Sequence, residues 1–404
     1  MKHAIEPPKK ILRGGLVAAA GLVVLAAAAC SAPTPPRSVA ASISPSARPT
    51  GPLTLPAPTG THPVGTTALF LKDTSRPDPW VPEAKARELK VTLWYPTRAR
   101  EGRRAQYMTP KESELILKGK KVTGAPYDVL SKTRTNAFSD AKPAGRKGSL
   151  ALVVLSPGFT MPSSTLTTLA EELAGSGYVV AGIDHTYENY ATTFPDGRIA
   201  ECVACDSDSD FGFGTKVVGV RAADVSFVLD RLTGSSAKWE GSSLIDPSKI
   251  AMAGQSIGGA GTVAAMVKDS RVRAGINMDG TTYARIPKSG LSRPFMFLGS
   301  AGHPPGGRDN SWDRDWKLLT GWKRWLLLSG GEHQSFTDVP LLAEVLGLGH
   351  PGELSPARSA EITRTYVRAF FDLHLHTRRQ PLLDEPSPRY PEVKLCTPDN
   401  KICG

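Results

Sequence analysis

The chain has 404 residues and a formal net charge of +11, from 49 Lys and Arg against 38 Asp and Glu. A basic chain can bind nucleic acid, but no nucleic-acid-binding motif accompanies this charge, so we expect no nucleic-acid partner. Much of the surplus lies between Arg98 and Lys147, where thirteen basic residues stand against five acidic ones. We expect this segment to be a basic surface excursion, either solvated or in contact with anionic lipid or cell-wall polymer.

The amino terminus has the pattern of an export signal. Basic residues precede fourteen uncharged, mostly apolar residues from Leu16 to Ala29. Such a run is short for a bilayer crossing but suits a signal peptide, so residues 1–29 are predicted to be one. Cys30 directly follows small residues, as in a bacterial lipobox, and is predicted to carry a lipid anchor. Plain secretion with cleavage nearby is the alternative.

Residues 31–60 are rich in Pro, Ser, Ala and Thr and have almost no large apolar side chains, so they cannot bury a core. The segment 30–60 is therefore expected to tether the protein to the outer face of the bacterial cytoplasmic membrane. Residues 61–404, about 340 in all, suffice for one large catalytic domain, which we expect to be a monomer.

Apolar runs and amphipathic stretches alternate along this domain. Strands are predicted at 88–95, 150–155, 178–183, 249–254, 273–278, 293–298 and 324–328, and helices at 163–175, 215–232, 257–268 and 359–376. The alternation predicts an α/β fold with a mostly parallel central sheet and helices on both faces. In the helix at 215–232, Arg221, Asp224, Asp230 and Arg231 fall between the apolar positions, which predicts an amphipathic helix packed on the sheet.

The strand at 150–155 opens into Ser156-Pro157-Gly158-Phe159. In an acyl-transfer enzyme, a loop at this place can aim a backbone N–H at the oxyanion of the tetrahedral intermediate. We therefore predict that the N–H of Phe159 is one oxyanion donor. A plain strand-to-loop turn is the alternative.

The most informative motif is Gly254-Gln255-Ser256-Ile257-Gly258, between the apolar strand at 249–254 and the helix at 257–268. A serine on such a strand-turn-helix junction is typical of the nucleophile elbow, where a strained backbone holds the hydroxyl clear of the sheet. Gly254 and Gly258 leave room for strand and helix to pass closely. Ser256 is the predicted nucleophile, and the N–H of Ile257 the second oxyanion donor.

A serine nucleophile needs a histidine base and a carboxylate that orients it. Asp279 ends the strand at 273–278, and His333 lies on the loop after the strand at 324–328. We predict the catalytic set Ser256, Asp279 and His333. Asp309 and Asp313 are weaker candidates for the acid because a long loop separates them from their strand.

The other histidines are expected to be ordinary surface or core residues. His374 and His376, two positions apart on the helix at 359–376, point to different faces and cannot share a metal. His185 receives the same interpretation, and His303 is the fallback base. We expect neither a metal nor a cofactor.

Four cysteines remain besides Cys30, in a compartment that allows disulfides. The pairs Cys202 with Cys205 and Cys396 with Cys403 are favoured because each closes a short loop. The other two pairings and a zinc site remain alternatives.

Together, Ser156-Pro157-Gly158-Phe159, Gly254-Gln255-Ser256-Ile257-Gly258-Gly259, Gly275-Ile276-Asn277-Met278-Asp279 and the segment His333 to Asp338 resemble the platelet-activating-factor acetylhydrolase (group VII phospholipase A2) branch of the α/β-hydrolases, in its bacterial lipase-like form. The resemblance spans roughly residues 62–393. It implies an α/β-hydrolase fold and a triad at Ser256, Asp279 and His333. Pro157 and Gln255 stand where relatives often have histidine, which affects the shape of the acyl pocket.

The expected activity is therefore hydrolysis of a carboxylic ester through an acyl-enzyme, on a short-chain or oxidised phospholipid or another small ester. A cutinase-like polyesterase is the alternative among enzymes, although its usual acid follows a later strand, where this chain has Gly299-Ser300-Ala301-Gly302. A catalytically silent surface lipoprotein on a hydrolase scaffold is the alternative outside enzymes.

Overall fold

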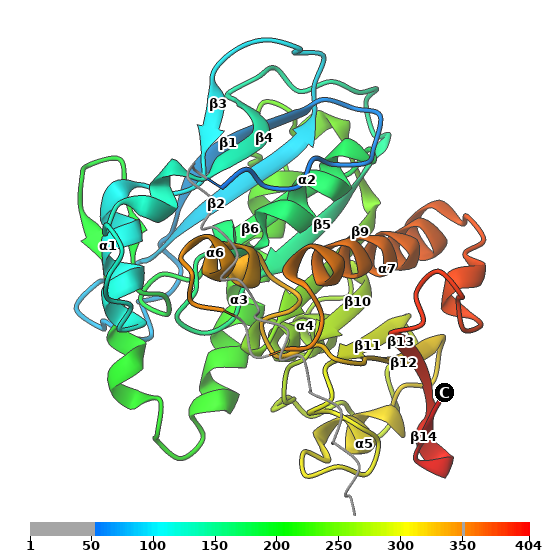
Figure 1. Ribbon diagram of the computed structural model, residues 1–404. Helices are drawn as coiled ribbons and strands as arrows, with labels where there is room; N and C mark the ends of the chain where they lie inside the picture. Colours follow the sequence, from blue (N-terminus) through cyan, green and yellow to red (C-terminus); the bar gives the residue numbers. More distant parts are fainter. Residues whose placement is uncertain (1–52, 350–351) are drawn as a thin grey trace, which may run out of the picture. The chain divides into compact units, whose positions relative to one another are not determined.

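The computed structural model describes residues 53–349 and 352–404 (Figure 1). The expected signal peptide at 1–29, the expected lipidation site Cys30 and residues 31–52 of the tether lie outside the described residues. The prediction for the rest of the tether was wrong, because residues 53–60 pack on the folded domain: Leu55 is buried in a core cluster and Thr59 donates to Glu172. In the described part of the chain, no helix combines the length and the apolar character that a bilayer crossing requires.

A 12-stranded sheet, in the order β14-β13-β12-β11-β10-β9-β5-β6-β2-β1-β4-β3, organises the described chain. Its centre is a run of parallel strands: β6 (Val179–Asp184), β5 (Leu150–Ser156), β9 (Ile245–Gln255), β10 (Val272–Met278), β11 (Phe295–Gly299) and β12 (Lys323–Leu328). These strands are apolar almost throughout because helices cover both of their faces. Their carboxyl ends meet at one edge, where ligand and catalytic sites of such sheets lie.

Shorter and antiparallel strands extend the sheet on both sides. On one side, β2 (Arg87–Pro96) pairs antiparallel with β6 and with β1 (Val64–Asp73), followed by β4 (Arg134–Ser139) and β3 (Arg104–Gln106). On the other side, β13 (Val393–Thr397) and β14 (Ile402–Cys403) form a hairpin on β12. This mixed sheet is the α/β-hydrolase architecture predicted from the sequence.

Two pairs of helices enclose the sheet. α3 (Phe213–Thr233) and α4 (Ile257–Lys268) contribute to the core on one face, and α2 (Thr167–Gly175) and α7 (Pro356–His376) to the core on the other. All four correspond to predicted helices. The prediction for α3 was wrong in one respect: Arg221 and Asp224 are buried and do not form a solvated face.

The basic segment between Arg98 and Lys147 is more than a surface excursion. It contains β3, α1 (Pro110–Gly119), the 3-10 helix η1 (Val129–Lys132) and β4. Tyr107, Ile116 and Leu130 from this segment are buried in a separate small core cluster. A capping box in which Thr109 and Glu112 exchange hydrogen bonds starts α1.

The remaining elements are short. They comprise η2 (Ser163–Leu166), β7 (Thr192–Thr193), β8 (Ile199–Ala200), η3 (Val203–Ser207), η4 (Ser242–Leu244), α5 (Ser311–Trp316), α6 (Val339–Val345), η5 (Pro381–Leu383) and η6 (Pro398–Asn400). Disulfides join Cys202 to Cys205 beside η3 and Cys396 to Cys403 across the β13–β14 hairpin. These two pairs are the ones predicted from the sequence because each closes a short loop.

Candidate active site

Ser256 lies between the end of β9 and the start of α4, with a strained backbone at φ 55° and ψ −127°. The crossing of strand and helix is tight. A Cβ atom on Gly254 would lie 2.2 Å from the carbonyl carbon of Gly258, and one on Gly258 would lie 2.0 Å from the carbonyl oxygen of Ser156. Only glycine fits at either position, so the local sequence dictates the turn that exposes the serine.

Asp279 follows the neighbouring strand, β10, and also has a positive φ, of 57°. Gln255 pairs with Met278 in the register of β9 and β10, so the residues after them, Ser256 and Asp279, leave the sheet side by side. The amide of Ser256 donates to the carbonyl of Met278 at 2.8 Å. Asn277 hydrogen-bonds both backbone groups of Gly280 and so fixes the turn that follows the carboxylate.

His333 lies on the loop between β12 and α6, and its Nδ1 donates to Oδ2 of Asp279 over 2.6 Å. The side chain of Gln255 donates to the carbonyl of His333 at 2.8 Å and holds this loop against the elbow. The hydrogen bonds among the described residues do not include one between Ser256 Oγ and His333 Nε2. In unliganded hydrolases that bond is often long and shortens when substrate binds.

His303 also binds Asp279, which the sequence did not predict. Its Nδ1 donates to Oδ1 of the carboxylate at 2.9 Å, and its Nε2 lies at an ion-pair distance of 3.3 Å from Oδ2 of Asp309. The imidazole stacks on Trp312, with ring centroids 4.5 Å apart. Asp309, a weaker candidate for the acid, therefore contacts this second histidine and is one residue removed from Asp279.

The charge states of Asp279 and His303 follow from their contacts. Burial disfavours a charged Asp279, but hydrogen bonds from His303 and His333 outweigh it and hold the pKa of Asp279 well below its usual range. Burial likewise opposes the charged form of His303, yet its bonds to Asp279 and Asp309 raise the pKa of His303 to about 9. At neutral pH, His303 is thus an imidazolium between two carboxylates.

The two predicted oxyanion donors belong to elements next to Ser256. Ile257 is the first residue of α4, and Phe159 belongs to the loop after β5. Among the residues that the structure describes, neither amide donates to another protein group. The side chain of Gln255 packs directly against Gly158, where an added Cβ would come within 2.5 Å of its Oε1. Gln255 therefore contacts both the loop after β5 and the loop that carries His333.

A buried ionic cluster binds the loop that begins at Ser156 and contains Phe159. Arg221 donates to Glu188 at 2.8 Å, to Ser156 Oγ at 3.1 Å and to the carbonyl of Pro157. His185 bridges Ser156 Oγ and Asp224 at 3.0 and 2.8 Å. The cluster continues to Arg87, whose guanidinium donates to both oxygens of Asp224.

The interpretation of His185 as an ordinary residue was therefore incomplete, because this histidine is buried in the ionic cluster that holds the loop after β5. Burial lowers the pKa of His185, and the nearby Arg221 lowers it further. His374, in contrast, lies on α7, where its ring packs against Trp322 and Phe370 and takes no part in this cluster. In residues 53–349 and 352–404, no three or more His, Cys, Asp or Glu side chains are grouped so that they could hold a metal ion.

An aromatic surface adjoins the oxyanion loop. The rings of Phe159 and Phe213 meet edge to face at 5.1 Å, and Trp80 lies 5.8 Å beyond Phe213. Ile257 and Tyr187 are partly buried in the same cluster. Trp80 is buried, whereas Phe159 and Phe213 are partly exposed, so these two rings can meet an apolar or aromatic part of a substrate.

Comparisons with known proteins agree with this fold. The chain matches the model of the family described as platelet-activating factor acetylhydrolase, isoform II, over residues 49–202 and 230–381. A probable 1-alkyl-2-acetylglycerophosphocholine esterase of Arthroderma benhamiae is 27% identical over 373 residues, which is 84% of this chain and 92% of that protein. The platelet-activating factor acetylhydrolase of Gallus gallus is 23% identical over 275 residues, 56% of this chain and 63% of that protein.

A solved structure adds a closer match in sequence. The ferulic acid esterase of Streptomyces cinnamoneus is 44% identical, with a TM-score of 0.76, over 85% of this chain and 99% of that one. Fold and relatives together define a carboxylic ester hydrolase with the α/β-hydrolase fold. The chain belongs to the platelet-activating factor acetylhydrolase, isoform II, family, which confirms the resemblance noted in the sequence.

Proposed function

We propose that the protein is a serine esterase in which Ser256 is the nucleophile, His333 the general base and Asp279 the acid that orients the base. The observation that carries the proposal is the 2.6 Å bond from His333 to Asp279 beside the strained elbow of Ser256. A carboxylate bound to Nδ1 fixes the tautomer in which Nε2 can accept a proton, and it stabilises the imidazolium that results.

The reaction then takes two steps. Ser256 Oγ attacks the ester carbonyl while His333 Nε2 accepts the hydroxyl proton, and the N–H groups of Phe159 and Ile257 stabilise the oxyanion. When the intermediate collapses, the bond to the alcohol oxygen breaks and His333 returns the proton to that oxygen. Water, deprotonated by His333, attacks the acyl-enzyme in the same way, which releases the acid and restores Ser256.

The substrate we propose is an ester of a small aromatic acid of the hydroxycinnamate type. Support comes from the partly exposed rings of Phe159 and Phe213, which pack on the buried Trp80, and from the 44% identity with a ferulic acid esterase. An acetylated or oxidised phospholipid, the substrate class expected from the sequence, is the second candidate. It is favoured by the name of the family and of its fungal relative.

The mechanism is tested with a fluorophosphonate probe and with turnover of 4-nitrophenyl acetate. Ser256→Ala should abolish labelling and lower turnover by about 10⁴-fold or more, because no other group replaces the nucleophile. Ser248→Ala, at an exposed position in the first half of β9, is the matched control and should change neither. Labelling of another serine, or normal turnover by the Ser256 variant, would contradict the proposal.

The substrate class is tested by comparing methyl ferulate with a thio analogue of platelet-activating factor. Phe213→Ala should lower kcat/KM for methyl ferulate by roughly tenfold and affect a small acetyl ester less, because only the aromatic acyl group needs this surface. Phe211→Ala is the control, since Phe211 is fully exposed at 108%. Faster turnover of the phospholipid analogue, with no effect of Phe213→Ala, would favour the second candidate.

For location, the two disulfides indicate an exported protein, because such bonds persist in oxidising compartments. We further propose that Cys30 carries a diacylglyceryl anchor and that residues 31–52 are the spacer between membrane and enzyme. Support comes from the small residues before Cys30 and from the composition of the spacer. The catalytic domain would then work at the outer face of the cytoplasmic membrane.

A further inference from the structure

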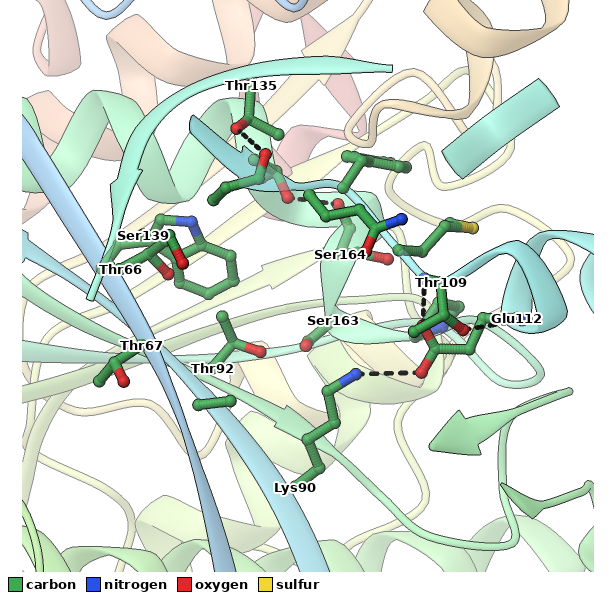
Figure 2. A pocket seen from close by; sticks show the side chains of 18 of the residues that line it. Thr66, Thr67, Lys90, Thr92, Thr109, Glu112, Thr135, Ser139, Ser163 and Ser164 are labelled. Atoms are coloured by element: carbon green, nitrogen blue, oxygen red, sulfur yellow. Dashed lines mark hydrogen bonds and ion pairs between the residues drawn. The ribbon is translucent and has the colours of Figure 1, made fainter. Parts of the chain in front are cut away.

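Two of the cavities in the described chain differ in what lines them. The larger, of about 530 Å³, is lined by residues of β1, β2 and β3, and Figure 2 shows Lys90 and Glu112 facing each other at one end of it. Its charged groups pair with one another, since Nζ of Lys90 lies 3.0 Å from Glu112 and 3.7 Å from Asp184. Among the described residues that line this cavity, none belongs to the proposed triad. The larger cavity is therefore separate from the ester site.

The smaller cavity, of about 190 Å³, lies beside the proposed base. His333 is one of its lining residues. Most of the remaining surface is apolar and comes from two other parts of the chain: Val339, Pro340 and Ala343 of α6, and Leu354 just before α7. These four side chains are half-buried, so each presents part of its carbon surface to the cavity. An apolar cavity thus adjoins the residue that moves the proton in the proposed reaction.

Hydrogen bonds tie the walls of the smaller cavity together. The amide of Leu354 donates to the carbonyl of Gly330 at 3.1 Å, which joins the segment before α7 to the loop that carries His333. Within that loop, the amide of Ser335 donates to the carbonyl of Glu332 at 2.9 Å, and the hydroxyl of Ser335 accepts from the amide of Glu332 at 2.8 Å. A ligand that enters this cavity therefore has little of the protein left to order.

The role proposed for His333 determines which part of a substrate lies next to this cavity. When the tetrahedral intermediate collapses, Nε2 of His333 returns a proton to the alcohol oxygen, which must then lie within hydrogen-bond distance, about 2.6–3.2 Å. The acyl group remains bonded to Ser256 at that stage. The substituent on the alcohol oxygen therefore extends from the side of His333, and the acyl group does not.

We propose that the smaller cavity is the alcohol subsite of the esterase and that it binds a short alkyl group of the ester alcohol. The assignment rests on the proposed serine mechanism, but not on which acyl group the enzyme cleaves. A polar or charged alcohol would lose its hydration there without gaining hydrogen bonds from Val339, Pro340, Ala343 and Leu354. An alkyl group gains free energy from the same burial, and the enzyme can use that gain in the transition state.

The test compares the acetate esters of methyl, ethyl, propyl and butyl alcohol. All four form the same acetyl-enzyme, so the length of the alcohol acts on the acylation step, which kcat/KM reports. Each rate is divided by the rate of alkaline hydrolysis of the same ester. Each methylene buried in the cavity should raise kcat/KM roughly twofold to fourfold, which is roughly tenfold to sixtyfold from methyl to butyl. Labelling of Ser256 by a fluorophosphonate shows separately whether the serine mechanism operates.

Variants on α6 locate the subsite. Ala343→Phe places a ring in the cavity and should reduce the butyl-to-methyl ratio of kcat/KM to about two or less. Glu344→Phe adds the same ring at the next position, which is exposed and outside the cavity, and should keep the wild-type ratio. Val339→Ser makes one wall polar without filling the cavity and should lower the ratio about twofold to fivefold. The serine variant gives the answer even where Ala343→Phe fails to fold.

The possible failures can be told apart. If Ser256 is labelled but kcat/KM does not rise with the length of the alcohol, the alcohol subsite is overturned and the serine mechanism stands. If Ser256 is not labelled, the proposed function fails and the subsite fails with it. A second series, from methyl acetate to methyl butanoate, varies only the acyl group. If Ala343→Phe lowers kcat/KM along that series and not along the alcohol series, the cavity holds the acyl group, which also overturns the proposal.

Discussion

His303 and His333 hydrogen-bond opposite oxygens of one carboxylate, that of Asp279, at 2.9 and 2.6 Å. A carboxylate in a serine hydrolase ordinarily serves one imidazole. Here a second, charged imidazole shares it and is itself held by Asp309. Asp279 is therefore fixed on both of its oxygens, which limits the positions that the ring of His333 can take.

Asp279→Asn should lower kcat/KM by orders of magnitude, about 10⁴-fold in a comparable triad, because the proposed base loses the partner that sets its tautomer. Asp309→Asn should lower kcat/KM no more than about tenfold, since the contacts of Asp309 are to His303, Thr281 and Ser311 and not to Asp279 or His333. Steady-state kinetics of both variants on one ester give the ranking. The reverse ranking would transfer the role of the acid to the later strand.

His303→Gln should change the pH dependence of stability. The pKa of His303 rises from 6.5 to about 9 on folding, so its contribution is fully present below pH 6.5 and is lost as the pH rises through about 9. Wild type should exceed the variant by on the order of 2 kcal/mol at pH 6 and approach it at pH 10. Urea unfolding at several pH values measures the difference. A gap independent of pH would mean that His303 is neutral in the fold.

Asp338→Asn should stabilise the protein at pH 8. Asp338 is buried, with 2% of its surface exposed. Burial raises the pKa of Asp338 to about 7, although the amide of Thr168 and the hydroxyl of Tyr107 donate to it. The charged form is therefore a cost that grows as the pH rises from 3.8 through 7. The variant should gain roughly 1–3 kcal/mol at pH 8 and little at pH 4. Asp224→Asn, which leaves Arg87 with less compensation, is the contrasting control and should destabilise.

Arg221→Lys should impair catalysis through the oxyanion loop. A lysine keeps the charge but cannot donate to Glu188, Ser156 and the carbonyl of Pro157 together. We expect kcat to fall by about tenfold or more with a smaller change in KM, because an oxyanion donor acts mainly in the transition state. Unchanged kcat in a variant that folds normally would show that the buried cluster serves stability alone.

Mass spectrometry of the amino-terminal peptide tests the anchor. The mature chain should begin at Cys30 with a diacylglyceryl thioether, and Cys30→Ser should release active enzyme into the medium. The described domain should have the same kcat in both forms, because the proposed spacer, residues 31–52, only positions it. A soluble wild type with an unmodified cysteine, or cleavage elsewhere, would contradict the prediction.

The sequence predicted the site residues that directly follow the ends of strands. Ser256 and Asp279 follow apolar strands that pair in register, and a strand followed by glycines precedes His333, so local patterns place all three. Local sequence patterns did not predict the residues that hydrogen-bond to these three. His303 lies on a loop that carries no periodic signal, and only the fold brings it to Asp279.

The buried cluster was missed for another reason. Arg221 and Asp224 occupy positions that a helical pattern assigns to solvent, because a charged residue is almost never buried unless it is paired. Their partners, Glu188 and Arg87, come from distant loops and strands, so the pairing is a property of the tertiary structure. One feature of the sequence could have indicated the cluster: a helix with charged residues near its apolar positions, in a chain whose strands also have charged residues at their ends.

The hairpin of β13 and β14 has a practical consequence. It covers β12, the strand that precedes His333, and Cys396–Cys403 closes it. Without the hairpin, β12 would offer a row of unpaired amide and carbonyl groups on an apolar strand, which is a template for association between chains. Recombinant enzyme made in a reducing cytosol should therefore precipitate more readily than enzyme directed to the periplasm, even though no cysteine takes part in the chemistry.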